Sequence, residues 1–141
     1  MTKGKLVTVT RQDLPEGVQC VQSCHSAIDF VFEHPTRAGP WHSSSNTLVM
    51  LTVKDEKALR HLIRKCNYLC LSCTVFREPN IGNEITAICM EPHPETYKMV
   101  QKLPLLLPKT ESNEQENTGN QSTISQLCEN EVIQEEIRQF K

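Results

Sequence analysis

The sequence predicts a three-layer α/β/α domain with a mixed four-stranded sheet, in the element order β-α-β-α-β-β-α, followed by a disordered acidic C-terminal tail. Three observations lead to this prediction. Runs of β-branched and apolar residues alternate with stretches in which apolar residues recur at helical spacing. The composition changes near Pro108, after which residues 109–126 are almost entirely polar. A length of 141 residues suits one domain with room for a tail.

The first strand is expected over Lys5–Thr10, and a helix over 18–34 that ends before Pro35. Its apolar face, which we expect to pack on the sheet, is marked by residues spaced three, four, three and four apart: Val18, Val21, His25, Ile28 and Phe32. Four further residues widen that face: Cys20, Cys24, Ala27 and Val31. The polar side is formed by Gln22, Ser26, Asp29 and Glu33. The Gly/Pro/Ser-rich residues 36–45 are expected to form a loop that carries Trp41.

The later elements follow the same logic. Asp55 is a candidate N-cap for a helix that carries Leu59, Leu62 and Ile63. The remaining elements are a strand over 47–53, a strand over 69–76, a loop over 77–84, a strand over 85–90 and a helix over 94–102. The two last strands are expected to pair antiparallel and the earlier crossovers to be parallel units.

The net charge changes sign near Pro108, where the composition also changes. The net charge of −2 separates into +2 on residues 1–108 and −4 on residues 109–141. We therefore expect a folded domain over 1–107, mildly basic, and an acidic low-complexity tail over 108–141. Apolar residues recur at helical spacing near 127–140, which fits either a short helix that docks on a protein partner or a weakly helical acidic tail.

The cysteines and histidines favour no metal site. Seven cysteines without a secretory signal indicate reduced thiols of a cytoplasmic protein, used mostly as small core residues. Cys70 and Cys73 fall in a predicted strand, on opposite faces, and no second matching pair accompanies them. His25 fits a core histidine bonded to a backbone carbonyl better than a functional group. No run is long enough to cross a bilayer, and no cofactor is implied.

The segment 77–86 is the most informative for function. It holds two carboxylates, two amides and a hydroxyl between two strands, with Pro79 and Gly82 imposing shape. Loops on a rigid sheet often carry functional groups. Composition alone, however, also fits a hairpin connection rich in turn-forming residues.

Two motifs bear a resemblance. Arg11-x-Asp13-Leu14, followed by Gly17-x-x-x-x-Gln22-x-x-His25-Ser-Ala27, resembles the opening signature of the type-2 peptidyl-tRNA hydrolase family. Glu78…Thr86-Ala-Ile-Cys-Met-Glu-Pro92 is similar to that family's Asp…Thr-x-x-x-x-x-Pro segment. The resemblance covers about residues 5–105 and implies a mixed four-stranded sheet between helices, in agreement with the element order above.

The resemblance also implies a reaction, the hydrolysis of the ester that joins a peptide or blocked amino acid to tRNA, with tRNA as partner. It implies Glu78 as base or water-positioning carboxylate, Thr86 as its hydroxyl partner, and Asn83 with the first amides of the 18–34 helix facing the oxyanion or a phosphate. The expected tRNA contacts are Arg11, Arg77, Lys3 and Lys5. The expected supporting residues are Asp13, Gly17, Gln22 and His25. The resemblance is also compatible with a homodimer, because the family is often dimeric, and the sequence itself does not indicate an oligomeric state. A protein partner that binds through the C-terminal tail is equally compatible with it.

The sequence departs from the family pattern in two ways. Val18 stands where the family has a catalytic lysine, and the loop between Glu78 and Thr86 is shorter and lacks a threonine that the family uses. The chain is closer in these respects to a divergent branch, the peptidyl-tRNA-hydrolase-domain-containing proteins. The alternative function is therefore a catalytically weak or inactive module that binds tRNA or a protein.

Overall fold

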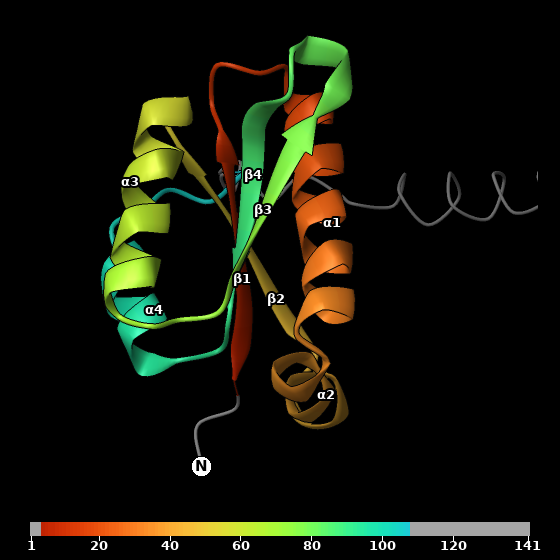
Figure 1. Cartoon of the computed structure of the whole chain (residues 1–141), viewed down its shortest axis with the longest axis vertical. Coiled ribbons are helices and arrows are strands. Elements are labelled where there is room, and N and C mark those ends of the chain that lie inside the picture. The colour runs from red at the N-terminus through yellow and green to blue at the C-terminus, as the bar shows by residue number, and fades with distance from the viewer. Residues whose placement is uncertain (1–3, 108–141) are drawn as a thin grey trace, which may run out of the picture. The chain divides into compact units, whose positions relative to one another are not determined.

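A computed structural model describes residues 4–107 of the chain. Its four strands are β1 (Lys5–Arg11), β2 (Thr47–Val53), β3 (Cys73–Glu78) and β4 (Glu84–Met90). They form one sheet in the order β2-β1-β4-β3 (Figure 1). β1 pairs parallel with β2, and β4 pairs antiparallel with both β1 and β3. The predicted mixed sheet is confirmed.

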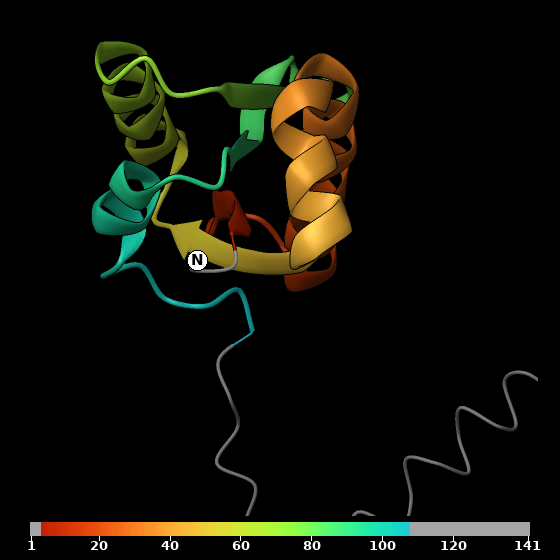
Figure 2. The same ribbon diagram turned by 90° about the horizontal axis from the view of Figure 1, so that it is seen from below.

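Helices cover both faces of the sheet (Figures 1 and 2). One face carries α1 (Glu16–Glu33) and α2 (Pro35–Ser44), and the other carries α3 (Glu56–Tyr68) and α4 (Pro94–Val100). The larger apolar core lies under α3 and α4 and includes Val9, Leu51, Leu59 and Ile88. A smaller core under α1 and α2 is built on Leu6, Phe30, Ala38 and Cys89. The three-layer architecture is therefore confirmed.

The α3 boundary follows the sequence. The Asp55 side chain accepts a hydrogen bond from the Ala58 amide at 3.0 Å, as an N-cap does. The strand predicted over 69–76, by contrast, begins only at Cys73. Cys70 has a left-handed backbone (φ 54°), and the Leu71 amide turns back to the Cys66 carbonyl at 2.9 Å. Cys70 thus lies in a turn, and β3 extends instead to Glu78, which was expected in a loop.

The predicted loop over 36–45 was wrong, because residues 35–44 form α2. Pro35 occupies the first turn, where its missing N–H costs nothing. Ala38 is buried, Trp41 packs on the smaller core, and the Trp41 Nε1 donates to the Thr47 carbonyl at 2.8 Å. This burial stabilises a helix whose Gly and Ser content argues against it.

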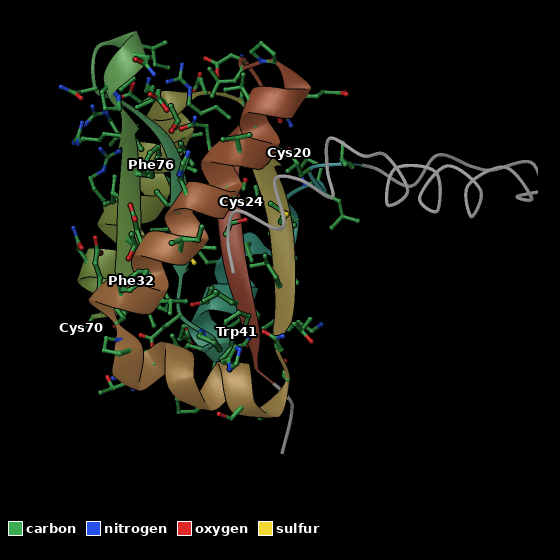
Figure 3. The ribbon with its side chains drawn as sticks, turned by 90° about the vertical axis from the view of Figure 1, so that its right-hand side faces the viewer. Cys20, Cys24, Phe32, Trp41, Cys70 and Phe76 are labelled. Carbon is green, nitrogen blue, oxygen red and sulfur yellow. The ribbon has the colours of Figure 1, made fainter. Side chains whose placement is uncertain are left out.

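The orientation of α1 was also predicted wrongly. Phe32, Ile28 and Val21 are 80%, 56% and 52% exposed, and Val18 and Val31 are exposed as well. Figure 3 looks onto α1, with Cys20, Cys24 and Phe32 along it. The residues that face the sheet are Gln19, Gln22, Ser23, Ser26 and Phe30. The sheet beneath carries buried threonines, and two of them, Thr86 and Thr74, donate hydrogen bonds to Gln22 and Glu33 of α1. Ser23 Oγ and Thr8 Oγ1 are buried without a hydrogen-bond partner among the described residues.

The segment after α4 covers one edge of the sheet. The Thr52 amide donates to the Pro104 carbonyl at 3.0 Å, and the Leu106 amide donates to the Met50 carbonyl at 2.9 Å. Residues 104–106 thus pair with the outer side of β2. The predicted tail over 108–141, its helix near 127–140, Lys3 and Cys128 lie outside the described residues.

Of the six cysteines within residues 4–107, only Cys66 and Cys89 are buried, whereas Cys24 and Cys70 are exposed. The expectation that the cysteines serve mostly as core residues therefore holds for few of them. Burial raises the pKa of the Cys89 thiol. Within the described range, no cluster of three or more His, Cys, Asp or Glu side chains could hold a metal ion. None of the helices in that range is long and apolar enough to span a membrane.

Candidate functional site

A bulge in β4 determines where Thr86 points. Phe76 pairs with Ala87, but the next residue of β3, Arg77, pairs with Ile85, so Thr86 is the extra residue of β4. An extra residue interrupts the alternation of side chains between the two faces. Ile85 belongs to the core under α3, and the Thr86 side chain faces α1. Thr86 is fully buried there, and its carbonyl accepts a hydrogen bond from Thr10 Oγ1 at 2.8 Å.

A hydrogen-bonded chain joins Thr86 to Glu78 through Gln22. Thr86 Oγ1 donates to Gln22 Oε1 at 2.5 Å. Gln22 Nε2 then donates to Glu78 Oε2 at 2.9 Å. Gln22 is buried, so its side-chain amide is fixed between the two partners. The structure therefore brings together three of the residues expected at the site.

The Glu78 carboxylate is held in its charged form. The hydrogen bond from Gln22 is the largest cause that lowers the pKa of Glu78, and the Asn80 amide, which donates to Glu78 Oε1 at 3.2 Å, lowers it further. The short 3₁₀ turn Pro79–Ile81 presents that amide. Asn83 closes the turn with a left-handed backbone, and its amide donates to the Glu78 carbonyl at 3.0 Å. The Asn83 side chain is exposed at the tip of this turn.

Two further contacts join α1 to β3, at residues of β3 that precede Glu78. The His25 ring stacks on the Phe76 ring, with 4.7 Å between centroids and 13° between planes. Farther along, Thr74 Oγ1 donates to Glu33 Oε2 at 2.8 Å. His25 is exposed and is not the core histidine that the sequence favoured. The stack fixes it beside Glu78, whose pKa it also lowers by its charge.

Arg11 forms a buried ionic clamp rather than a free basic side chain. Its Nε and Nη2 donate to the two carboxylate oxygens of Asp13, each at 2.8 Å. Its Nη1 donates to Glu84 Oε2 at 2.7 Å and to the Ile85 carbonyl at 3.2 Å. Arg11 is only 8% exposed, and the hydrogen bond from its guanidinium holds the pKa of Asp13 below its usual value. This clamp ties the turn after β1 to the start of β4.

The amino end of α1 lies within two turns of Gln22, the residue that bonds to Glu78. The N-cap residue is Pro15, which makes no side-chain cap, so the amides of the first turn are not capped by a side chain. Gly17 has open space where a Cβ would stand. The helix has 18 residues, and its positive dipole end adds to the attraction for an anion at this place.

Comparison with known protein families identifies this domain. Residues 4–106 match the family described as peptidyl-tRNA hydrolase PTH2. The chain belongs to this family.

Among solved structures, a protein of unknown function from Agrobacterium tumefaciens matches with a TM-score of 0.57 and 12% sequence identity. The match covers 74% of this chain and 98% of that chain, and at this identity it supports the fold alone. A search of curated proteins gives no significant match.

The family's remaining expected residues lie in different places. Val18, at the position of the family lysine, is 38% exposed in the first turn of α1. Arg77 is exposed on β3, next to Glu78, and its Nη1 donates to the Asn83 carbonyl at 3.2 Å. Lys5 begins β1 and lies beyond the Val7–Met90 pair, whereas Glu78 pairs with Glu84 at the opposite end of β4. The Lys5 amide donates to the Tyr97 hydroxyl at 2.7 Å. Lys5, which was expected to contact tRNA together with Arg77, therefore lies at the other end of the sheet from Arg77 and Glu78.

Sequence reasoning missed two features of the site. The first is the hydrogen bond that the Thr10 hydroxyl donates to the Thr86 carbonyl. The second is the bulge, which turns the Thr86 side chain toward α1. Neither is visible in hydrophobic patterning, since a bulge depends on how two strands pair.

Proposed function

We propose that this PTH2-family protein hydrolyses the ester bond of peptidyl-tRNA, or of N-blocked aminoacyl-tRNA, and releases free tRNA. The observation that carries the proposal is the Thr86–Gln22–Glu78 hydrogen-bonded chain, which joins α1 at its seventh residue, within two turns of an amino end that no side chain caps. Family membership supports the same reaction. Ester hydrolysis needs an oriented water and donors for the developing oxyanion, and these two features supply candidates for each.

Glu78 has the role of positioning water. A general base works best when its pKa lies near the working pH. The pKa of Glu78 is lowered by Gln22 and Asn80, so its carboxylate is a weak proton acceptor at neutral pH. A charged, fixed carboxylate is nevertheless a good hydrogen-bond acceptor for the attacking water. Gln22, itself held by Thr86, keeps the Glu78 carboxylate in place. The His25 ring, stacked on Phe76, lies beside it.

The first amides of α1 receive the negative charge. Open space above Gly17 lets a substrate oxygen approach the helix backbone closely. These amides would stabilise either the oxyanion or the terminal phosphate of the tRNA. Asn83, at the exposed tip of the 3₁₀ turn, is a second candidate donor. Because its guanidinium is already engaged, Arg11 has a structural role in this proposal, and Asp13 serves as its partner.

A second candidate is a non-catalytic module that retains the fold in order to bind tRNA. Val18 favours it, because an apolar side chain replaces the family's lysine in the first turn of α1. This candidate predicts binding of tRNA without ester cleavage.

The test is release of acetylated amino acid from N-acetyl-aminoacyl-tRNA by the full chain. We expect turnover above the uncatalysed rate, with Glu78→Gln and Thr86→Val each lowering kcat by at least about tenfold. Glu95→Gln, an exposed carboxylate on α4, is the matched control and should leave kcat unchanged. Equal rates for all four proteins would remove the proposed roles, and no turnover by the wild type would favour the binding module.

A further inference from the structure

We propose that a groove between α3 and β3 binds the phosphate backbone of tRNA and guides its acceptor end to the Glu78 cluster. The groove is lined by Arg60, Ile63, Arg64, Val75, Arg77 and Ile85, and we call it the arginine groove. The proposal rests on the proposed function for the identity of the RNA, and on the geometry below for the site.

The arginine groove is a shallow, concave site of about 260 Å³ on the exposed edge of the sheet. Its apolar residues come from both elements and from β4, and they form a surface against which the aliphatic stems of arginine can lie. Arg60 and Arg64 are one helical turn apart on the same side of α3, and Arg77 faces them from β3. Three planar guanidinium groups thus gather around one hollow.

Two of these guanidinium groups have no carboxylate partner among the described residues, so a phosphate would not have to displace one. Arg60 is engaged on one side, where its Nε donates to Glu56 Oε1 at 2.7 Å. Arg64 and Arg77, in contrast, form no ion pair with any residue between 4 and 107. Exposed Lys57 and His61 continue the basic surface along α3. Arginine forks match the geometry of phosphate oxygens and hold them more specifically than point charges do.

The two flanking helices differ in charge, which indicates the side from which RNA approaches. α1 contains Glu16, Asp29 and Glu33 and no lysine or arginine, whereas α3 contains Lys57, Arg60, Arg64 and Lys65 against Glu56 alone. A polyanion is therefore attracted to the α3 side of the sheet and repelled from the exposed face of α1.

The arginine groove adjoins the candidate site through one strand. Arg77 and Glu78 are consecutive residues of β3, so their side chains leave the strand toward opposite faces. β3 is an edge strand of the sheet. An RNA strand that crosses this edge would touch Arg64 and Arg77 on one side and present its terminal ester to Glu78 on the other.

The test measures the affinity of fluorescently labelled deacylated tRNA for the full chain by anisotropy, over a series of salt concentrations. For Arg64→Gln/Arg77→Gln we expect affinity to fall on the order of tenfold and the salt slope to decrease by about 0.7–0.9 per lost phosphate contact. Lys98→Gln/Lys102→Gln, which removes two positive charges from exposed positions in and just after α4, is the matched control and should change neither quantity appreciably. Arg64→Lys/Arg77→Lys, which keeps both charges, should retain the slope.

Two results would overturn the proposal. One is an unchanged salt slope in the Gln double variant. The other is an equal loss in the α4 control, which would indicate attraction by net charge alone. If the groove bound an acidic protein fragment while tRNA affinity did not change in the arginine variants, the proposal would also be overturned. Because deacylated tRNA has no ester, this experiment is independent of turnover: an inactive wild type would remove the proposed hydrolysis and leave the groove intact.

Discussion

Gln22 Nε2 donates to Glu78 Oε2 at 2.9 Å, and this bond links α1 to the end of β3. It is also the largest cause of the lowered pKa of Glu78. A carboxylate with a lowered pKa stays charged until the pH falls below its ordinary value of 4.5, so any activity that requires it should persist into mildly acidic solution.

Replacing Gln22 should therefore move the acid limb of the pH–rate profile. Gln22→Leu removes the donor, the pKa of Glu78 rises, and kcat/KM should begin to fall at a higher pH than in the wild type. Gln19→Leu makes the same substitution on the same buried side of α1, where Gln19 bonds to the Leu14 carbonyl instead. Measured profiles of the three proteins should separate only Gln22→Leu, and coincident acid limbs would contradict the assignment.

A lysine at position 18 should raise turnover. Val18 is exposed in the first turn of α1, so Val18→Lys places an ammonium near the proposed oxyanion without burying it. One added positive donor at a developing oxyanion contributes on the order of tenfold or more in kcat. Val21→Lys, one turn later and more exposed, is the control and should leave kcat near the wild-type value. A steady-state comparison in which both variants gain equally would point to general attraction of tRNA.

Loss of the Arg11 clamp should destabilise the fold in a pH-dependent way. Arg11→Gln leaves Asp13 and Glu84 without their cation, and we expect the free energy of unfolding to fall by about 2 kcal/mol at neutral pH. Because the folded pKa of Asp13 is lowered from 3.8, its contribution is present above that value and is lost as the pH falls through the folded pKa.

The stability difference between wild type and Arg11→Gln should consequently shrink in acid. Urea unfolding at pH 7 and at pH 3 measures it. A difference that grows toward pH 3 would mean that the clamp is not held by ionised carboxylates.

On α1, replacing an apolar residue should affect the free energy of unfolding less than replacing a polar one, because the polar side of the helix is the side that packs on the sheet. Ile28→Gln, on the exposed side, should change the free energy of unfolding by no more than about 0.5 kcal/mol. Ser23→Leu, at a fully buried position, should cost about 1–3 kcal/mol through overpacking against the sheet. Denaturation of both variants would settle the orientation, since a helix packed by its valines would reverse the order of the two effects.

The sheet could be predicted because its strands carry strong local signals. Residues 47–53 form an almost unbroken apolar run, and the structure has β2 over Thr47–Val53. Asp55 caps α3 as its residue type indicates. Such signals are local, so the elements that they mark can be predicted without knowing the tertiary contacts.

Features that depend on long-range contacts could not be predicted. The apolar stripe of α1 suggested burial, but the sheet offers threonines, and Gln22 and Ser26 pack there instead. The helix over 35–44 depends on Ala38 and Trp41 reaching a core that the local sequence does not reveal. Arg60 and Arg64 line a groove only because the fold places α3 opposite Arg77 of β3, a long-range relationship that no local pattern encodes.

The pairing of residues 104–106 with β2 bears on how the domain behaves in concentrated solution. Those residues occupy the outer hydrogen-bonding groups of one edge strand, so β3 is the edge left open among the described strands. An open edge invites another chain to pair with it, and Arg77 and Pro79 discourage this with charge and a missing donor. A fragment cut directly after α4 would uncover a second edge, at Met50 and Thr52 of β2, without such protection. Expression fragments should therefore extend to Leu107 if they are to resist strand-to-strand aggregation.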